Sequence, residues 1–207
     1  MGKDYEHKKQ VIPWGAYEIE LMVDSSFNPD SANNLYQYQS LHIEKEWEEL
    51  TSPNANRGVF TKRFIDGEKE MIHSLFIGNT GAGDRLHPQS FWQKADRLFL
   101  IVGHFLYALQ LPHLSLLWKN QVDHITCFSL HPYAEGLLIH GEFQISHWSW
   151  EGHCNWKYQG RDIFVTYEEG LDFKIEGDLI RVKDFSDHVY YLNAQGKEIR
   201  SYKDESN

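Results

Sequence analysis

LFLIVGHFLYALQLPHLSLLW, residues 98–118, is the stretch that decides the fold of this chain. Its length and apolar character resemble those of a membrane-spanning helix. However, Pro112 would break a helix, and His104 places a polar side chain within the apolar run. Gly103 and Pro112 instead divide the stretch into pieces of strand length. The pattern therefore predicts buried β-strands and no membrane span.

Turn signals on both sides of this stretch predict a mainly β fold. Upstream, the runs at residues 59–65 and 71–77 flank an Asp-Gly hairpin signal at residues 66–67. Downstream, short apolar or alternating runs are separated by turn residues about one hairpin apart. We expect an antiparallel meander packed as a sandwich, a barrel or incomplete blade-like sheets. One short helix is expected near residues 90–97, because Ser90 can cap its first turn.

A short repeat in the last third of the chain also indicates hairpins. A turn glycine is followed three residues later by an isoleucine, at steps of 17 and 19 residues. We expect each glycine to close a turn and each isoleucine to return to the core. The three copies are Gly160 with Ile163, Gly177 with Ile180, and Gly196 with Ile199.

Two segments carry a resemblance to a known family. VGHFLYALQLPHLSLLWKNQ, residues 102–121, contains a Tyr-Ala-Leu strand at residues 107–109 and a second strand with Trp118 near its end. It resembles the blade strands of quinoprotein-type β-propeller repeats, although Pro-His at residues 112–113 replaces the Thr-Gly turn of that pattern. VYYLNAQGKEI, residues 189–199, resembles the same repeats. The resemblance implies β-architecture only, and no family is assigned to the whole chain.

The composition narrows the class of partner and the compartment. A formal net charge of −10 argues against a nucleic-acid partner, which needs a basic face, and favours a basic protein partner. Cys127 and Cys154 are too few for a secreted disulfide scaffold, so we expect free thiols and a cytoplasmic protein. The length fits one domain over residues 1–207, with a flexible tail at residues 1–12. A subdomain boundary near residue 88 is the alternative.

The segment HGEFQISHWSWEGHCNWKYQGRDIF, residues 140–164, concentrates side chains that could carry chemistry. Alternation predicts a hairpin of residues 138–150 and 153–158 around a Glu-Gly turn. One face then carries His147 and Cys154 and points into the core. His140 lies far along the hairpin from the turn, so the three histidines of this segment do not converge on one ion. We therefore expect no metal site from this segment alone.

A metal site built from distant residues is the alternative enzyme hypothesis. His140 and Glu142, together with His188 and the more distant Arg200, resemble the facial triad and arginine of cupin-like Fe(II)-dependent oxygenases. Two imidazoles and a carboxylate are the ligands that non-haem Fe(II) needs. A second His-x-acid match occurs at residues 42–44, and twelve histidines make one or two such matches expected by chance.

The remaining hypothesis is protein binding at the tip of the hairpin. Trp148 and Trp150 are the kind of aromatic anchors that carry interface energy, with Glu151 and His153 beside them. The alternative is that a neighbouring strand covers the two tryptophans. We predict a non-catalytic, cofactor-free protein-binding domain, in its most concrete form a bacterial immunity protein that neutralises a basic toxin. A barrel that binds a small ligand is a third candidate.

Overall fold

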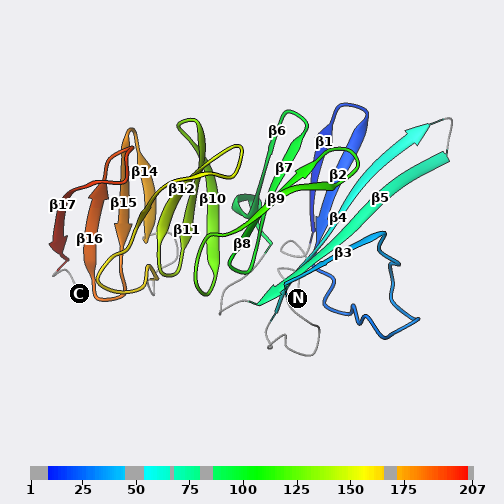
Figure 1. The fold of residues 1–207 in the computed structure, drawn as a ribbon, viewed down its shortest axis with the longest axis horizontal. Coiled ribbons are helices and arrows are strands. Elements are labelled where there is room, and N and C mark those ends of the chain that lie inside the picture. The colour runs from blue at the N-terminus through cyan, green and yellow to red at the C-terminus, as the bar shows by residue number, and fades with distance from the viewer. Residues whose placement is uncertain (1–8, 45–53, 66–67, 80–85, 166–171, 205–207) are drawn as a thin grey trace, which may run out of the picture.

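The computed structural model of the chain describes residues 9–44, 54–65, 68–79, 86–165 and 172–204. In these residues the chain forms four β-sheets that lie side by side in chain order (Figure 1). None of the sheets closes into a barrel. The prediction of a mainly β, antiparallel fold of blade-like sheets is therefore confirmed, and the barrel alternative is wrong.

The first sheet has the strand order β1-β2-β4-β5-β3. Its long hairpin β4–β5 extends beyond the neighbouring strands at one end of the molecule (Figure 1). All pairs are antiparallel except β3 with β5, which run parallel. The strands are β1 (Lys9–Trp14), β2 (Tyr17–Met22), β3 (Ser40–Ile43), β4 (Asn54–Ile65) and β5 (Glu68–Asn79).

The other three sheets are four-stranded antiparallel meanders, each built from consecutive strands. The second sheet contains β6 (Phe91–Lys94), β7 (Arg97–Val102), β8 (Phe105–Gln110) and β9 (Ser115–Gln121). The third contains β10 (Cys127–Tyr133), β11 (Gly136–Gly141), β12 (Ile145–Ser149) and β13 (Cys154–Tyr158). The fourth contains β14 (Phe173–Glu176), β15 (Leu179–Lys183), β16 (His188–Leu192) and β17 (Glu198–Lys203).

The stretch at residues 98–118 folds as its breakers predict. It supplies β7, β8 and β9, and the chain reverses at Gly103 and again around Pro112. Gly103 has a φ of +59°, and a Cβ at this position would lie 2.0 Å from the carbonyl oxygen of Asn79. Only glycine fits there without strain. No helix among the described residues is long and apolar enough to cross a membrane.

The predicted helix at residues 90–97 is wrong. Ser90 does belong to a capping box, but as the third residue of a single 3₁₀ turn, Pro88–Ser90, whose N-cap is His87. The chain then enters β6, and Ala95 adopts a φ of 52° in the turn that leads to β7. Alternating burial in β6 and its pairing with β7 favour a strand over a helix.

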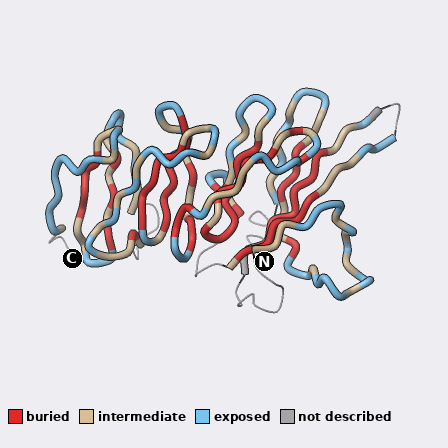
Figure 2. The backbone as a smooth tube through the Cα atoms, in the orientation of Figure 1, coloured by how far each residue is buried: buried red, intermediate tan, exposed pale blue. Residues whose placement is uncertain are grey.

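The core lies in the three interfaces between adjacent sheets, and Figure 2 shows buried residues along the strands of every sheet. We call the interfaces between the first and second, second and third, and third and fourth sheets the first, second and third seams. In β7, Leu98, Leu100 and Val102 enter the first seam, whereas Phe99 and Ile101 enter the second. Successive side chains of a strand point to opposite faces, so a sheet between two others must be apolar on both.

Other expectations from the sequence have mixed outcomes. Residues 9–12, expected in a flexible tail, are part of β1, and residues 1–8 lie outside the described residues. Residue 88 falls between the first and second sheets, which share the first seam. Gly177 and Gly196 do adopt positive φ in turns, and Ile180 is buried. Ile199 is 52% exposed, so its predicted return to the core is wrong.

A buried carboxylate ties the second sheet to the third. Asp123 is 1% exposed and follows β9. Its Oδ1 accepts hydrogen bonds from the backbone N–H groups of His124 and Ile125, at 2.7 and 2.9 Å. Its Oδ2 accepts from those of Phe143 and Gln144, at 3.0 and 3.1 Å. Four backbone donors thus compensate the desolvated charge and fix two loops against each other.

Replacing Asp123 by Asn should lower the free energy of unfolding by about 2–4 kcal/mol, because the amide NH₂ group would face backbone donors in a buried site. Urea titration followed by tryptophan fluorescence measures the change. The matched control is Asp30→Asn in an exposed loop, which should alter stability by less than about 0.5 kcal/mol. Equal effects of the two substitutions would contradict the role of Asp123.

Candidate functional site

The end of the β12–β13 hairpin docks on the second sheet. The carbonyl oxygen of Trp150 accepts hydrogen bonds from Arg97 Nη1 at 3.2 Å and from Trp118 Nε1 at 3.3 Å. The side chain of Asn120 donates to the carbonyl oxygen of Gly152 at 2.9 Å. Gly152 has a φ of +84°, and a Cβ there would meet the Trp118 ring at 2.8 Å. Three side chains of the second sheet therefore hold the hairpin end in one position, through hydrogen bonds to its backbone carbonyl groups.

The two tryptophans of the hairpin differ in exposure. Trp148 is 6% exposed and packs in the second seam, so the neighbouring sheet covers its indole. Trp150 is half-buried against the ring of Phe99, with centroids 5.4 Å apart, and the Lys94 ammonium lies 3.6 Å from its ring centroid. Its Nε1 is buried and has no hydrogen-bond partner.

Exposed residues surround Trp150. Glu151 and His153 are exposed, and a Glu151 carboxylate oxygen lies 3.7 Å from the Arg97 guanidinium. Trp92, 39% exposed, lies two residues before Lys94 on the same side of β6. An aromatic, mixed-charge surface thus adjoins the fixed hairpin end. We call the surface formed by Trp92, Lys94, Trp150, Glu151 and His153 the Trp150 surface.

A β-bulge changes the face that Cys154 occupies. His147 pairs with Trp156, but Trp148 pairs with Cys154, so one residue of β13 has no counterpart. Cys154 therefore leaves the face of His147 and is exposed, which makes its predicted inward orientation wrong. His147 is buried as expected, with Nε2 donating to the Tyr133 carbonyl oxygen at 3.0 Å.

The three residues of the oxygenase hypothesis lie in separate environments. His140, on β11 of the third sheet, stacks on Phe173 of β14 in the fourth sheet and donates through Nε2 to the carbonyl oxygen of Phe164, at 3.1 Å. Glu142 lies in the loop after β11, so the predicted continuous strand through residues 138–150 is wrong. His188 contacts Arg161, at 3.2 Å. In the part of the chain that the structure describes, no group of three His, Cys, Asp or Glu side chains could hold a metal ion.

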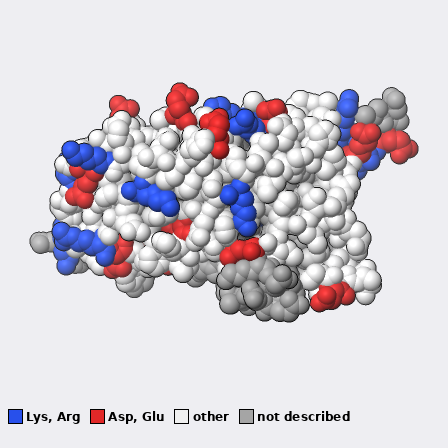
Figure 3. All heavy atoms as spheres, in the orientation of Figure 1, with Lys and Arg blue, Asp and Glu red and all other residues white. Residues whose placement is uncertain are grey.

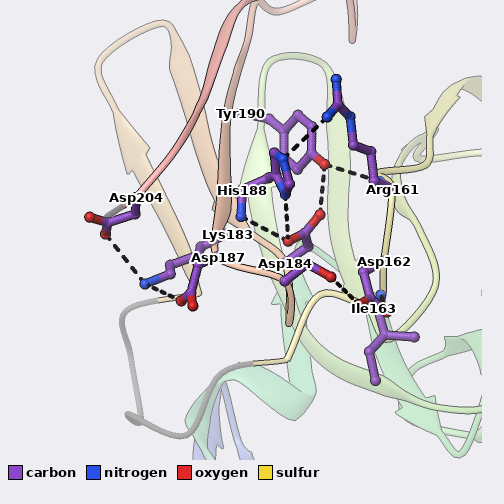
Figure 4. A network of polar contacts seen from close by, with 10 residues as sticks. Arg161, Asp162, Ile163, Lys183, Asp184, Asp187, His188, Tyr190 and Asp204 are labelled. Carbon is purple, nitrogen blue, oxygen red and sulfur yellow. Dashed lines mark hydrogen bonds and ion pairs between the residues drawn. The ribbon is translucent and has the colours of Figure 1, made fainter. Parts of the chain in front are cut away.

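His188 belongs instead to a network around the fully buried Asp184 (Figure 4). Asp184 Oδ2 accepts from the Tyr190 hydroxyl at 2.6 Å, and Oδ1 accepts from the backbone N–H of His188 at 2.9 Å. Burial and this hydrogen bond raise the pKa of Tyr190 to about 12. The Ser186 hydroxyl donates to Asp162 and not to His188. The network therefore holds the turn between Asp184 and His188 in place.

The third seam also collects histidines. His131 and His140 each lie 4.9 Å from the Phe173 ring, centroid to centroid, and the His131 Nε2 lies 2.8 Å from the Ser129 hydroxyl. Burial lowers the pKa of His131 to about 4, with the charges of His140 and His87 adding to the effect. Burial also lowers the pKa of His140. Both rings are therefore neutral at pH 7.

The free energy of unfolding should fall as the pH drops from about 6.5 towards 4. A histidine whose pKa is depressed in the folded state favours the folded chain fully above its unfolded pKa of about 6.5. Below that pH the unfolded chain takes up the proton first, and His131 should contribute a loss of about 1–3 kcal/mol. Urea titrations at pH 7.0, 5.5 and 4.5 measure it.

His131→Phe keeps a ring against Phe173 but removes the titrating group, so its pH dependence should be shallower than that of the wild type. His153→Gln, at an exposed position outside the third seam, is the matched control and should keep the wild-type slope. An unchanged slope in His131→Phe would show that the proton uptake occurs elsewhere.

A mixed-charge cluster that the sequence did not predict lies at the edge of the first seam. Lys119 on β9 pairs with Tyr107 on β8, and Glu44 Oε1 lies 3.3 Å from His104 Nε2. The sequence offered two signals: alternation puts Lys119 on the face of Tyr107, and residues 42–44 form the second His-x-acid match. We call the group of His42, Glu44, His104, Tyr107 and Lys119 the Lys119 cluster.

Comparison with known proteins gives weak structural likeness and no family. No protein-family model and no curated protein match the chain. Among solved structures, the Neurospora crassa Pan2 WD40 domain is 11% identical with a TM-score of 0.43, over 57% of this chain and 41% of that one. The computationally designed Ika8 protein is 8% identical with a TM-score of 0.44, over 70% and 46%. A europium-containing methanol dehydrogenase is 10% identical with a TM-score of 0.46, over 71% and 38%.

The chain thus spans less than half of each of these three structures. The WD40 domain and the methanol dehydrogenase are β-propeller structures, and the resemblance of this chain to them is weak. The two segments that resemble propeller blades in the sequence, residues 102–121 and 189–199, occupy equivalent places. They form the hairpins β8–β9 and β16–β17, which are the third and fourth strands of their sheets.

Proposed function

We propose that the protein is a non-catalytic protein-binding domain that contacts its partner through the Trp150 surface. The observation that carries the proposal is the half-buried Trp150 indole beneath Lys94, on a hairpin end that three hydrogen bonds fix to the second sheet. A surface fixed before binding loses little conformational entropy when a partner docks.

The composition of the surface supports the proposal. Tryptophan is enriched among residues that dominate interface energies, and the Trp150 ring lies beneath the Lys94 ammonium and next to Glu151 in the chain. Trp148 supports the hairpin from below, in the second seam, and would not touch the partner. Trp150, Glu151 and His153 remain the contact residues that the sequence predicted, and Trp92 and Lys94 join them.

A basic partner fits the overall charge. The formal net charge of −10 would attract a cationic protein over distances near the Debye length. On the face shown in Figure 3, acidic and basic side chains are mixed and form no single acidic patch. Attraction would therefore come from net charge, and specificity from the aromatic surface. An immunity protein that neutralises a basic toxin is the most concrete form of this function.

The test compares surface variants of the full chain in partner capture from an extract of the source cells, followed by measurement of Kd for the protein retained. Trp92→Ala and Glu151→Lys should each weaken the complex about tenfold or more. Ile125→Ala and Glu135→Lys, which change an exposed apolar residue and an exposed acid elsewhere, are the matched controls and should keep wild-type affinity.

The association rate should fall as the salt concentration rises, because screening weakens charge steering. A rate that does not depend on salt would remove the basic partner from the proposal. Equal affinity of the surface variants and the controls would refute the Trp150 surface as the contact site.

A further inference from the structure

A cavity of about 350 Å³ lies between the first sheet and the turn from β8 to β9. Its volume is at the lower end of the range that small-molecule sites have, roughly 300–1,000 Å³. All the residues that line it belong to the described part of the chain. We call it the Tyr17 cavity. Its lining includes Tyr17, Thr61, Glu70 and Ile72 from the first sheet, and Pro112 and His113 from the turn.

The turn that forms one wall of the cavity is held in place by both sheets. Leu111 and Leu114 are buried in the first seam. The Thr61 hydroxyl donates to the carbonyl oxygen of Pro112 at 2.7 Å, and the backbone N–H of Leu111 donates to the carbonyl oxygen of Asp96 at 2.8 Å. This wall is therefore in place before a ligand enters, which lowers the entropic cost of binding.

The opposite wall carries two adjacent charges of opposite sign. Arg63 on β4 pairs with Tyr17 on one side and with Glu70 on the other. Directly opposite side chains project from the same face of a sheet, with Cβ atoms roughly 5 Å apart. The Arg63 guanidinium carbon lies 5.5 Å from the Tyr17 ring centroid. Within the described ranges, the side chains of Arg63, Glu70 and His113 make no hydrogen bond or ion pair.

The signs of these charges decide which ligand the cavity suits. An anion would be repelled by Glu70, and a cation would be repelled by Arg63. A zwitterion with closely spaced charges satisfies both, because a guanidinium binds a carboxylate through two parallel hydrogen bonds and a carboxylate accepts from an ammonium group. The remaining lining from Ile72, Pro112 and the Tyr17 ring is apolar. A free α-amino acid with an apolar side chain has all three of the required parts.

We propose that the Tyr17 cavity binds a free α-amino acid with an apolar side chain. The Arg63 guanidinium holds the carboxylate of the ligand, and the Glu70 carboxylate accepts hydrogen bonds from its ammonium group. The side chain of the ligand lies against Ile72, Pro112 and the Tyr17 ring. The cavity shares no residue with the Trp150 surface, so this site does not depend on the function proposed above.

Calorimetric titration of the full chain with three related compounds tests the proposal. L-leucine carries both charges, 4-methylpentanoate lacks the ammonium group, and 3-methylbutylamine lacks the carboxylate. L-leucine should bind with a Kd below about 1 mM, and each analogue should bind about tenfold more weakly or worse, because it leaves one protein charge unpaired. No saturable binding of L-leucine, or equal affinity for the three compounds, would overturn the proposal.

Two variants assign the charges of the ligand to their partners. Arg63→Gln should remove the preference for L-leucine over 3-methylbutylamine but keep the preference over 4-methylpentanoate, and Glu70→Gln should do the reverse. Both residues lack polar partners within the protein, so the variants should keep the wild-type thermal unfolding midpoint within a few degrees.

The matched controls change exposed charges outside the cavity. Lys69→Gln lies on the other face of β5, and Glu135→Gln lies in the turn between β10 and β11, so both should keep the wild-type affinity and selectivity. Wild-type selectivity in both Arg63→Gln and Glu70→Gln, or the same loss in the controls, would overturn the placement of the ligand in the Tyr17 cavity.

Discussion

Burial on both faces is the constraint on which this structure depends. The second and third sheets each lie between two others, so their strands must supply apolar side chains to a seam on either side. In β7 three residues enter the first seam and two enter the second. In β11, Leu137 and Ile139 enter the second seam and Leu138 the third. Burial on both faces therefore explains why the run at residues 98–118 is continuously apolar and resembles a membrane segment.

The two faces of the fourth sheet differ in character. Ile180 and Val182 of β15 face the third seam, whereas Arg181 lies on the opposite side of the strand. On the adjoining strands the Arg200 guanidinium lies 3.8 Å from the Tyr191 ring centroid. Every residue of β17 is exposed. The outer face of the fourth sheet is therefore charged and aromatic.

Alternation and chain breakers predict the strands of the middle sheets because both are local features. Gly103 and Pro112 interrupt the apolar run where the chain turns, and no distant residue is needed to place them. The helix at residues 90–97 failed although the capping signal of Ser90 was real, because pairing with β7 decides the conformation of Phe91–Lys94. The predicted inward orientation of Cys154 was wrong for a related reason, because alternation alone does not reveal a bulge.

The candidate sites were harder to predict, since each joins residues from different sheets. The partners of Trp150 are on β6, β7 and β9, and the Lys119 cluster combines residues from both sides of residue 88. Counting charges also does not reveal that Asp123 and Asp184 are buried and accept hydrogen bonds from backbone N–H groups.

The three seams share one geometry but differ in chemistry. The second seam places Trp148 and Trp150 where they support an accessible hairpin end, which suits recognition of a partner. The third seam holds His131 and His140, whose pKa values are lowered by burial, so both rings are neutral at pH 7. At the edge of the first seam, the Lys119 cluster contains two buried polar atoms without a hydrogen-bond partner, the Tyr107 hydroxyl and His104 Nδ1. Because facing sheets fill each seam independently, a polar group at one edge leaves the apolar packing of the other two seams intact.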